Sequence, residues 1–156
     1  IDLNALEKVE EQVQDAVGKG ARIACGGQRV NATGFFYQPT VLLDASPEML
    51  IARDETFGPV APLFSFKEDR EAVDLANNTP YGLAAYLYSC DIGRIWRMAE
   101  ALEYGMVGIN TGRMSSEAAP FGGIKESGIG REGSKYGLEE YLELKYLCLG
   151  GLGQPL

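Results

Sequence analysis

Side chains that could do chemistry gather in three stretches of this sequence. The first stretch holds Asp54 and Glu55, two adjacent carboxylates that come directly before Phe57-Gly58-Pro59. A carboxylate in this position could accept hydrogen bonds from ribose hydroxyls, and Phe57 could pack on a flat ring. The alternative is a solvated acidic turn with an aromatic plug, that is, a turn in which the Phe57 ring is buried. Composition alone favours that alternative, because acidic residues are common in exposed turns.

The other two stretches combine arginine with hydroxyl or carboxylate groups. Arg113 lies close to Ser115 and Ser116, and this loop could hold a substrate carboxylate, although an ordinary polar loop is the favoured interpretation. Arg131 and Glu132 lie between glycines, with Glu143 near them in sequence. A structural arginine–carboxylate pair is favoured there over an acid or a base.

The third stretch belongs to a glycine-rich loop, Pro120–Gly133, in which five of fourteen residues are glycine. A long loop of this composition is typical of a functional segment, because glycine allows close approach of another group. Gly128–Gly133 matches the pattern G-x-G-x-x-G of dinucleotide-binding folds. That interpretation fails because no buried strand precedes it and only 156 − 133 = 23 residues follow.

The residue inventory excludes several kinds of site. The chain has no histidine, which removes Ser-His-Asp triads, Cys-His pairs and histidine metal sites, and we expect no metal. Cys25, Cys90 and Cys148 are too far apart for a metal or disulfide motif. We expect them to be free, buried thiols in a reducing compartment. None has an adjacent base, so no nucleophile is visible.

Length and charge limit the class of partner. The chain has 156 residues, of which 46% are hydrophobic, and a net charge of −8. We expect neither nucleic acid nor an anionic membrane as a partner, because both attract basic surfaces. No apolar run reaches the ~20 residues of a membrane span. The chain begins at Ile1 rather than methionine, so we expect a piece of a longer protein.

Periodicity predicts alternating helices and strands. Helices are expected from a cap at Asn4 to residue 17, where Gly18 and Gly20 stop it, briefly from Ser46, over 67–77, and from a cap at Asp91 to residue 102. The last of these should bury one apolar face. Strands are expected over 21–25, over 35–37 with 41–43, over 60–66 as an edge or bulged strand, over 83–88, and over 106–110 as a buried strand. This order predicts an α/β fold with a mostly parallel sheet flanked by helices.

The end of the chain predicts an assembly element. A short helix over 134–140 is followed by Tyr141–Leu149, where side chains alternate as in a strand. An unpaired terminal strand invites another chain, so we expect homo-oligomerisation through Tyr141–Leu149. The alternative is an internal edge strand of the same domain.

Five motifs occur in one order and together carry a family resemblance. They are Glu55-Thr56-Phe57-Gly58-Pro59-Val60, Pro80-Tyr81-Gly82-Leu83, Gly108-Ile109-Asn110, Pro120–Gly128 and Gly130-Arg131-Glu132. The set resembles the C-terminal part of the NAD(P)-dependent aldehyde dehydrogenase superfamily, over essentially the whole chain. Residues 103–112 and 131–146 look most like its succinate-semialdehyde dehydrogenases.

The resemblance implies cofactor and substrate roles. Glu55 matches a glutamate that binds the nicotinamide ribose of NAD or NADP, and Phe57 matches a phenylalanine packed near the nicotinamide ring. Ser115 matches a serine that binds the distal carboxylate of succinate semialdehyde. Phe121 matches an aromatic wall of the substrate tunnel.

Four further positions match residues of supporting function. Glu132 matches a glutamate proposed to relay protons, and Asn110 matches a structural position behind the site. Arg131 and Glu143 match residues that support the subunit interface. The resemblance divides the chain into 1–133, the end of the catalytic domain; 134–150, the connecting helix and oligomerisation strand; and 151–156, a tail.

The resemblance also implies what this chain lacks. In the family a cysteine forms a thiohemiacetal, hydride passes to the nicotinamide, and a glutamate base activates water for thioester hydrolysis. We expect both residues upstream of Ile1, so the chain alone should be inactive. Two alternatives stay open: another aldehyde, or a non-catalytic assembly module. The expected compartment is the cytoplasm, or alternatively the mitochondrial matrix.

Overall fold

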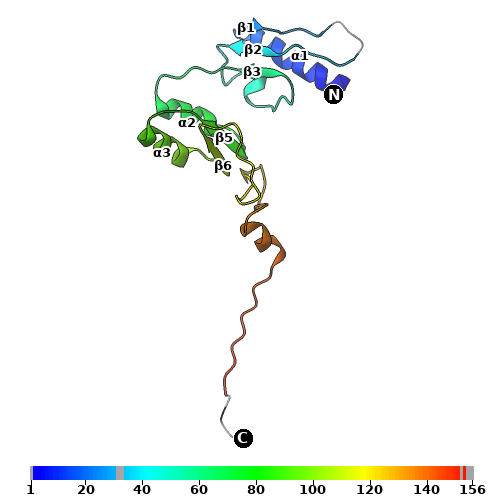
Figure 1. Ribbon diagram of the computed structural model, residues 1–156. Helices are drawn as coiled ribbons and strands as arrows, with labels where there is room; N and C mark the ends of the chain where they lie inside the picture. The colour runs from blue at the N-terminus through cyan, green and yellow to red at the C-terminus, as the bar shows by residue number, and fades with distance from the viewer. Residues whose placement is uncertain (1, 31–33, 152, 154–156) are drawn as a thin grey trace. The chain divides into compact units, whose positions relative to one another are not determined.

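The computed structural model describes residues 2–30, 34–151 and 153, and the chain forms two compact units. The first unit extends to Ala76 and the second begins at Asn77. In the first unit, helix α1 (Leu3–Gly18) lies beside a small sheet of β1 (Arg22–Cys25), β2 (Thr40–Leu43) and β3 (Val60–Pro62) (Figure 1). The unit also contains the 3-10 helix η1 (Leu50–Ala52) and most of helix α2 (Asp69–Asn77).

The core of the first unit joins α1 to β2 and η1. Its buried residues are Val13, Ala16, Ala21, Leu42, Met49 and Ile51. Leu42 and Met49 are almost completely buried. Burial of such side chains stabilises a fold by about 1.5–3 kcal/mol each, so this cluster fixes the helix on the sheet.

Helix α1 begins two residues earlier than the sequence predicts. Asp2, not Asn4, is the N-cap, and its carboxylate accepts a hydrogen bond of 2.8 Å from the Ala5 amide. A cap residue needs an extended backbone, which Asp2 has, whereas Asn4 already lies inside the helix. The predicted end of the helix at Gly18 is confirmed.

The second unit contains a strand–helix–strand segment and a short hairpin-like pairing. Strands β5 (Ala84–Leu87) and β6 (Met106–Ile109) pair in parallel, with helix α3 (Ile92–Ala101) between them in sequence. The predicted cap is confirmed, because Asp91 accepts a hydrogen bond of 3.0 Å from the Arg94 amide. Strands β4 (Tyr81–Gly82) and β7 (Ile124–Lys125) pair antiparallel, and a 3-10 helix η2 (Tyr136–Tyr141) follows.

The prediction of a mostly parallel sheet is wrong for the described residues. The strands form three small sheets instead: β1-β2-β3, which is mixed, the antiparallel pair β4-β7, and the parallel pair β5-β6. Local periodicity identified most of the strands, but pairing depends on contacts distant in sequence. The edge position predicted for the strand with Pro62 is confirmed, because β3 ends its sheet.

Several predicted elements are shorter or of another type. The strand expected over 35–37 is only an isolated bridge between Arg29 and Tyr37. The helix expected from Ser46 is a turn followed by η1, and the one expected over 134–140 is the 3-10 helix η2. Both of these helical segments are too short to complete several α-helical turns.

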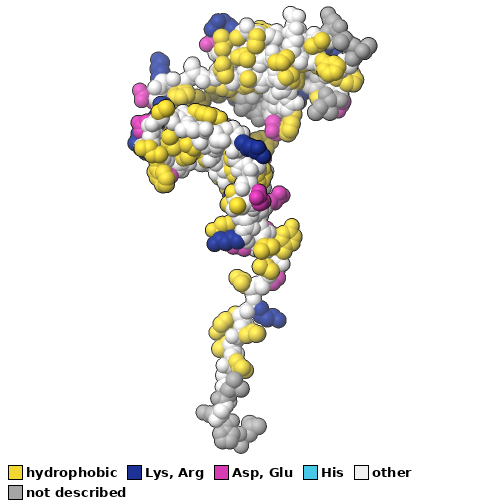
Figure 2. Space-filling model, viewed as in Figure 1, with side chains coloured by type: hydrophobic (Ala, Val, Ile, Leu, Met, Phe, Trp, Pro, Cys, Tyr) yellow, Lys and Arg dark blue, Asp and Glu magenta, His cyan; other side chains and the backbone are white. Residues whose placement is uncertain are grey.

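The predicted strand Tyr141–Leu149 is not a strand in this chain. Tyr141 ends η2, and residues 142–150 run without a β-ladder. Their side chains are exposed, including Leu144, Tyr146 and Leu147, and hydrophobic side chains stand out along this end of the chain in Figure 2. A strand requires hydrogen bonds to a partner, which the described part of the chain does not supply. The predicted tail at 151–156 lies mostly outside the described residues.

Burial in the second unit is lower than predicted. On the apolar face of α3 only Ile95 is buried, while Ile92 and Trp96 are 74% and 65% exposed. In β6 only Gly108 is buried. The three cysteines are free, as predicted, but all are exposed rather than buried. Among the described residues, no helix is long and apolar enough to cross a membrane.

Candidate functional site

Helix α1 holds the backbone of the loop Asp54–Pro59, called the acidic loop below. The Gln12 amide nitrogen donates a hydrogen bond of 2.9 Å to the carbonyl oxygen of Asp54. The Lys8 ammonium donates to the carbonyl oxygen of Glu55. These contacts use backbone carbonyls, so they leave both carboxylates available. The exposed Glu55 carboxylate can therefore accept hydrogen bonds from a ligand.

Phe57 extends this loop in a conformation that bulky residues seldom adopt. Its φ of +44° lies in the left-handed region, and its side chain is 77% exposed. Such strain persists only where the surroundings enforce it, and it concentrates at functional sites. Here the next residue packs on α1: a Cβ on Gly58 would overlap the Val9 side chain. The alternative of an aromatic plug is wrong, because Phe57 is not buried.

The acidic loop fits the cofactor predicted for it. A free carboxylate can accept hydrogen bonds from two ribose hydroxyls, and an exposed ring beside it can pack on a flat heterocycle. Glu55 and Phe57 provide these two features two residues apart, on a backbone anchored to α1. These are the two features that the predicted contacts to a nicotinamide ribose and ring require.

In the second unit the glycine loop folds back on itself. Phe121 and Glu132 form an isolated bridge, in which each amide donates to the other residue's carbonyl oxygen, at 2.8 and 2.7 Å. The predicted wall residue and the predicted relay residue are therefore neighbours. The loop also lies close against the segment between α3 and β6, since a Cβ on Gly105 would overlap the Gly122 carbonyl.

Arg131 contacts backbone rather than a carboxylate. Its Nη1 donates to the carbonyl oxygens of Gly123, at 2.8 Å, and Gly130, at 2.7 Å. Among the described residues the expected arginine–carboxylate pair is not formed, because the folded loop brings two carbonyl oxygens to the guanidinium. Arg131 consequently ties the two halves of the loop together.

The glycine loop borders a cavity of about 670 Å³. Among its lining residues are Leu83, Phe121, Ile129, Arg131, Glu132 and Tyr141. The cavity thus combines apolar side chains with two carboxylates, those of Glu132 and Glu140, and one guanidinium, as small-molecule sites do. Of the two predicted substrate residues, Phe121 borders this cavity. Ser115 lies in the exposed loop that precedes Phe121 in the chain, and it is not among the residues that line the cavity.

The remaining predicted positions lie apart from the cavity. Asn110 holds the segment between β5 and α3: its side chain accepts a hydrogen bond from the Ser89 amide at 2.9 Å and donates one to the Ser89 carbonyl at 2.8 Å. This supports a structural function. Glu143 is exposed in the extended segment 142–150. Among the described residues, no group of three or more acidic or cysteine side chains could hold a metal ion.

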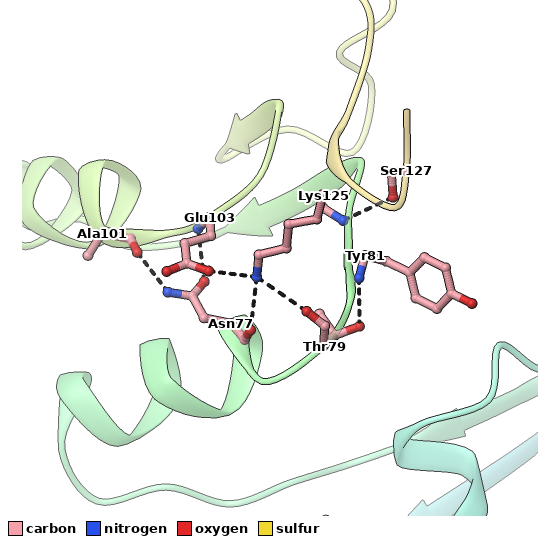
Figure 3. A network of polar contacts seen from close by, with 8 residues as sticks. Asn77, Thr79, Tyr81, Ala101, Glu103, Lys125 and Ser127 are labelled. Carbon is pink, nitrogen blue, oxygen red and sulfur yellow. Dashed lines mark hydrogen bonds and ion pairs between the residues drawn. The ribbon is translucent and has the colours of Figure 1, made fainter. Parts of the chain in front are cut away.

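Sequence reasoning missed a polar network around Lys125 (Figure 3). The Lys125 ammonium contacts the carbonyl oxygens of Asn77 and Thr79 and the carboxylate of Glu103. Nearby, burial raises the pKa of Tyr104, and the Lys125 charge opposes that effect. A lysine inside a glycine loop was the only sequence signal for this network.

Comparisons with known proteins show the family to which this sequence is similar. A profile of the aldehyde dehydrogenase family matches residues 1–147. A probable succinate-semialdehyde dehydrogenase [NADP(+)] from Sinorhizobium fredii is 61% identical over 97% of this chain. A glutarate-semialdehyde dehydrogenase from Pseudomonas aeruginosa is 57% identical, also over 97%.

The chain is also similar to a solved structure. The crystal structure of an E. coli NADP-dependent enzyme matches 96% of the chain with a TM-score of 0.93 and 57% identity. The chain spans 31% of that enzyme and 31–32% of the two curated relatives.

Proposed function

The chain belongs to the aldehyde dehydrogenase family, and on this premise we propose that it is the C-terminal part of an NAD(P)-dependent succinate-semialdehyde dehydrogenase. The whole protein would oxidise succinate semialdehyde to succinate through a cysteine thioester. The observation that carries the proposal is the acidic loop, where Glu55 and Phe57 are presented on a backbone anchored to α1. The high identity to a relative named for this activity supports the choice of substrate.

Each residue has a defined task in this proposal. Glu55 accepts hydrogen bonds from the ribose beside the nicotinamide, and Phe57 packs on the ring. When bound, the cofactor supplies the hydride acceptor. Phe121 forms one wall of the aldehyde site, and its apolar ring excludes water. Ser115 donates a hydrogen bond to the distal carboxylate of the substrate.

Glu132 is suited to hold and pass on a proton. It borders the cavity beside Phe121, and its backbone is fixed by the two hydrogen bonds of the bridge. A carboxylate fixed in backbone but free in side chain can shuttle a proton between the cavity and water. Glu132 is therefore proposed as a relay.

The nucleophile and the water-activating base are proposed to lie elsewhere in the whole protein. Cys25, Cys90 and Cys148 are exposed and do not occur in the nucleophile motif of the family. This chain alone is therefore proposed to be inactive. A second substrate, glutarate semialdehyde, is favoured by the relative from Pseudomonas aeruginosa that is named for it.

The whole protein is further proposed to be a homo-oligomer. The segment from Tyr141 to Leu149 is extended after its first residue, exposed and alternating in sequence. It could add a strand to a sheet of another copy, with Arg131 and Glu143 supporting the contact. The compartment is proposed to be the cytoplasm or the mitochondrial matrix.

The test is an assay of the natural protein that contains this sequence. Reduction of NAD and NADP is measured with succinate semialdehyde, glutarate semialdehyde and butanal, a four-carbon aldehyde without a carboxylate. The highest kcat/KM is expected for succinate semialdehyde. Glu55→Gln should raise the KM for the cofactor about tenfold, because hydrogen bonds to charged groups contribute about 1.5–3 kcal/mol, whereas Asp54→Asn should change it little. No turnover of any aldehyde would refute the proposal, and a preference for butanal would refute the substrate.

A further inference from the structure

Lys125 occupies a backbone position that lysine seldom adopts. Its φ is +55°, in the left-handed region where a Cβ is unfavourable. Such a residue costs of order 1–3 kcal/mol and persists where its surroundings hold it. Its side chain is only 22% exposed, although lysine side chains are usually solvated. The strained backbone and the covered side chain indicate that this lysine is held for a structural reason.

The contacts of the ammonium explain how it is held. Nζ donates to the Asn77 carbonyl oxygen at 3.0 Å and to the Thr79 carbonyl oxygen at 3.3 Å. It also forms an ion pair of 2.6 Å with Glu103 Oε2. A lysine ammonium has three donors and no acceptor. All three donors therefore have acceptors, and Figure 3 shows the lysine side chain reaching across to them.

These acceptors are themselves fixed to one another. The Asn77 side chain accepts from the Glu103 amide and donates to the Ala101 carbonyl oxygen, both at 2.8 Å. Asn77, the last residue of α2, is thus joined to the end of α3 and to Glu103, and Lys125 contacts both Asn77 and Glu103. An acceptor set built in this way holds the ammonium in one place.

Neighbouring contacts join the glycine loop to the same turn. Strand β7 pairs with β4, so that Lys125 lies opposite Tyr81. The Gly82 amide donates to Ser127 Oγ at 2.9 Å, and the Glu126 amide donates to the Pro80 carbonyl at 3.0 Å. The middle of the loop is therefore attached at residues 124–127.

We propose that Lys125 is a positioning residue that holds the glycine loop so that Phe121 and Glu132 border the cavity. Phe121 lies four residues before Lys125. The backbone bridge couples the position of Glu132 to that of Phe121. Without the ammonium, the left-handed backbone loses its support and the loop relaxes. The effect on catalysis rests on the proposed function, whereas the effect on the loop does not.

The first experiment measures the loop itself. In the natural protein, Lys125→Met keeps the unbranched part of the side chain up to Cε and removes the ammonium with its three donors. Hydrogen exchange of the Phe121 and Glu132 amides should become about tenfold faster, since hydrogen bonds to charged groups are worth about 1.5–3 kcal/mol. Exchange within α3 should stay unchanged. Lys67→Met is the matched control, because Lys67 is an exposed lysine of the first unit.

The second experiment separates positioning from stability. Lys125→Met should lower kcat/KM for the aldehyde about tenfold and leave the KM for the cofactor unchanged, because the acidic loop is anchored by other residues. Glu103→Gln should act in the same direction but more weakly. The double variant should be no worse than Lys125→Met alone, because both changes remove one interaction.

The outcomes test the positioning by Lys125 separately from the proposed dehydrogenase function. Unchanged exchange of the two amides in Lys125→Met would overturn it, as would faster exchange with unchanged aldehyde kinetics. If Lys125→Met fails to fold, Glu103→Gln and Lys125→Arg give the same readouts. A wild-type protein that oxidises no aldehyde would refute the proposed function, and amide exchange would then decide whether Lys125 holds the loop.

Discussion

The side-chain amide of Gln12 donates a hydrogen bond of 2.9 Å to the carbonyl oxygen of Asp54, the residue before Glu55. Gln12 is 2% exposed, and within the described residues its Oε1 is buried with no hydrogen-bond partner. Leaving a polar atom unsatisfied costs about 1–3 kcal/mol. The glutamine is therefore a poor choice for stability alone, and its value lies in anchoring the acidic loop.

Gln12→Met tests this anchor. Methionine has a similar length and removes both the anchoring donor and the unsatisfied acceptor, whose effects on the free energy of unfolding oppose each other. The melting temperature of the natural protein should change little. The KM for the cofactor should rise severalfold, because Glu55 and Phe57 lose a fixed backbone. Gln14→Met, at an exposed position of α1, is the control, and an unchanged KM in Gln12→Met would contradict the prediction.

Ser115→Ala tests recognition of the substrate carboxylate. Removing one hydrogen bond to a charged group should lower kcat/KM for succinate semialdehyde about tenfold or more. Butanal should be oxidised as before, because it has no distal carboxylate to bind. The neighbouring Ser116→Ala is the matched control. An equal loss for both aldehydes would show that Ser115 supports the loop rather than binding the carboxylate.

Asp15 links α1 to η1 in a way that depends on pH. Its carboxylate forms an ion pair of 2.7 Å with Lys19 and accepts from the Leu50 amide at 2.7 Å. The hydrogen bond from Lys19, followed by that from Leu50, lowers the pKa of Asp15 below its ordinary value. A lowered pKa in the folded state stabilises the fold above the unfolded pKa of ~3.9. That contribution disappears as the pH falls through the folded pKa.

Asp15→Asn should therefore lower the melting temperature of the natural protein at neutral pH. The difference from the wild type should shrink below about pH 4, as the wild-type carboxylate takes up its proton. Melting curves across this range provide the measurement, with the exposed Glu11→Gln as the control. A difference that stays constant down to the lowest pH would show that the charge of Asp15 does not contribute.

The sequence predicts local features of this chain better than those that depend on distant residues. The cap at Asp91 was predictable because the signal lies within four residues, and the end of α1 at Gly18 was too. The mostly parallel sheet was not, because strand pairing depends on residues far apart. Lys125 shows the same limit at the site. Its carbonyl acceptors lie 46 and 48 residues away, and any residue type has such a carbonyl.

In the extended segment 142–150 the local pattern is present and the partner is absent: its alternating sequence predicts a strand that this chain leaves unpaired. If the segment pairs with a second copy, its backbone amides must donate to that copy. Lys145→Pro removes one amide in the middle of the segment and is incompatible with a central strand. Lys145→Gln removes the same charge and keeps the amide.

The mass of the natural protein in solution, measured by light scattering, should therefore fall toward that of the monomer for Lys145→Pro and stay at the wild-type value for Lys145→Gln. An assembly unchanged by the proline would place the interface elsewhere, and a loss with both variants would assign the effect to the lysine charge instead of the backbone.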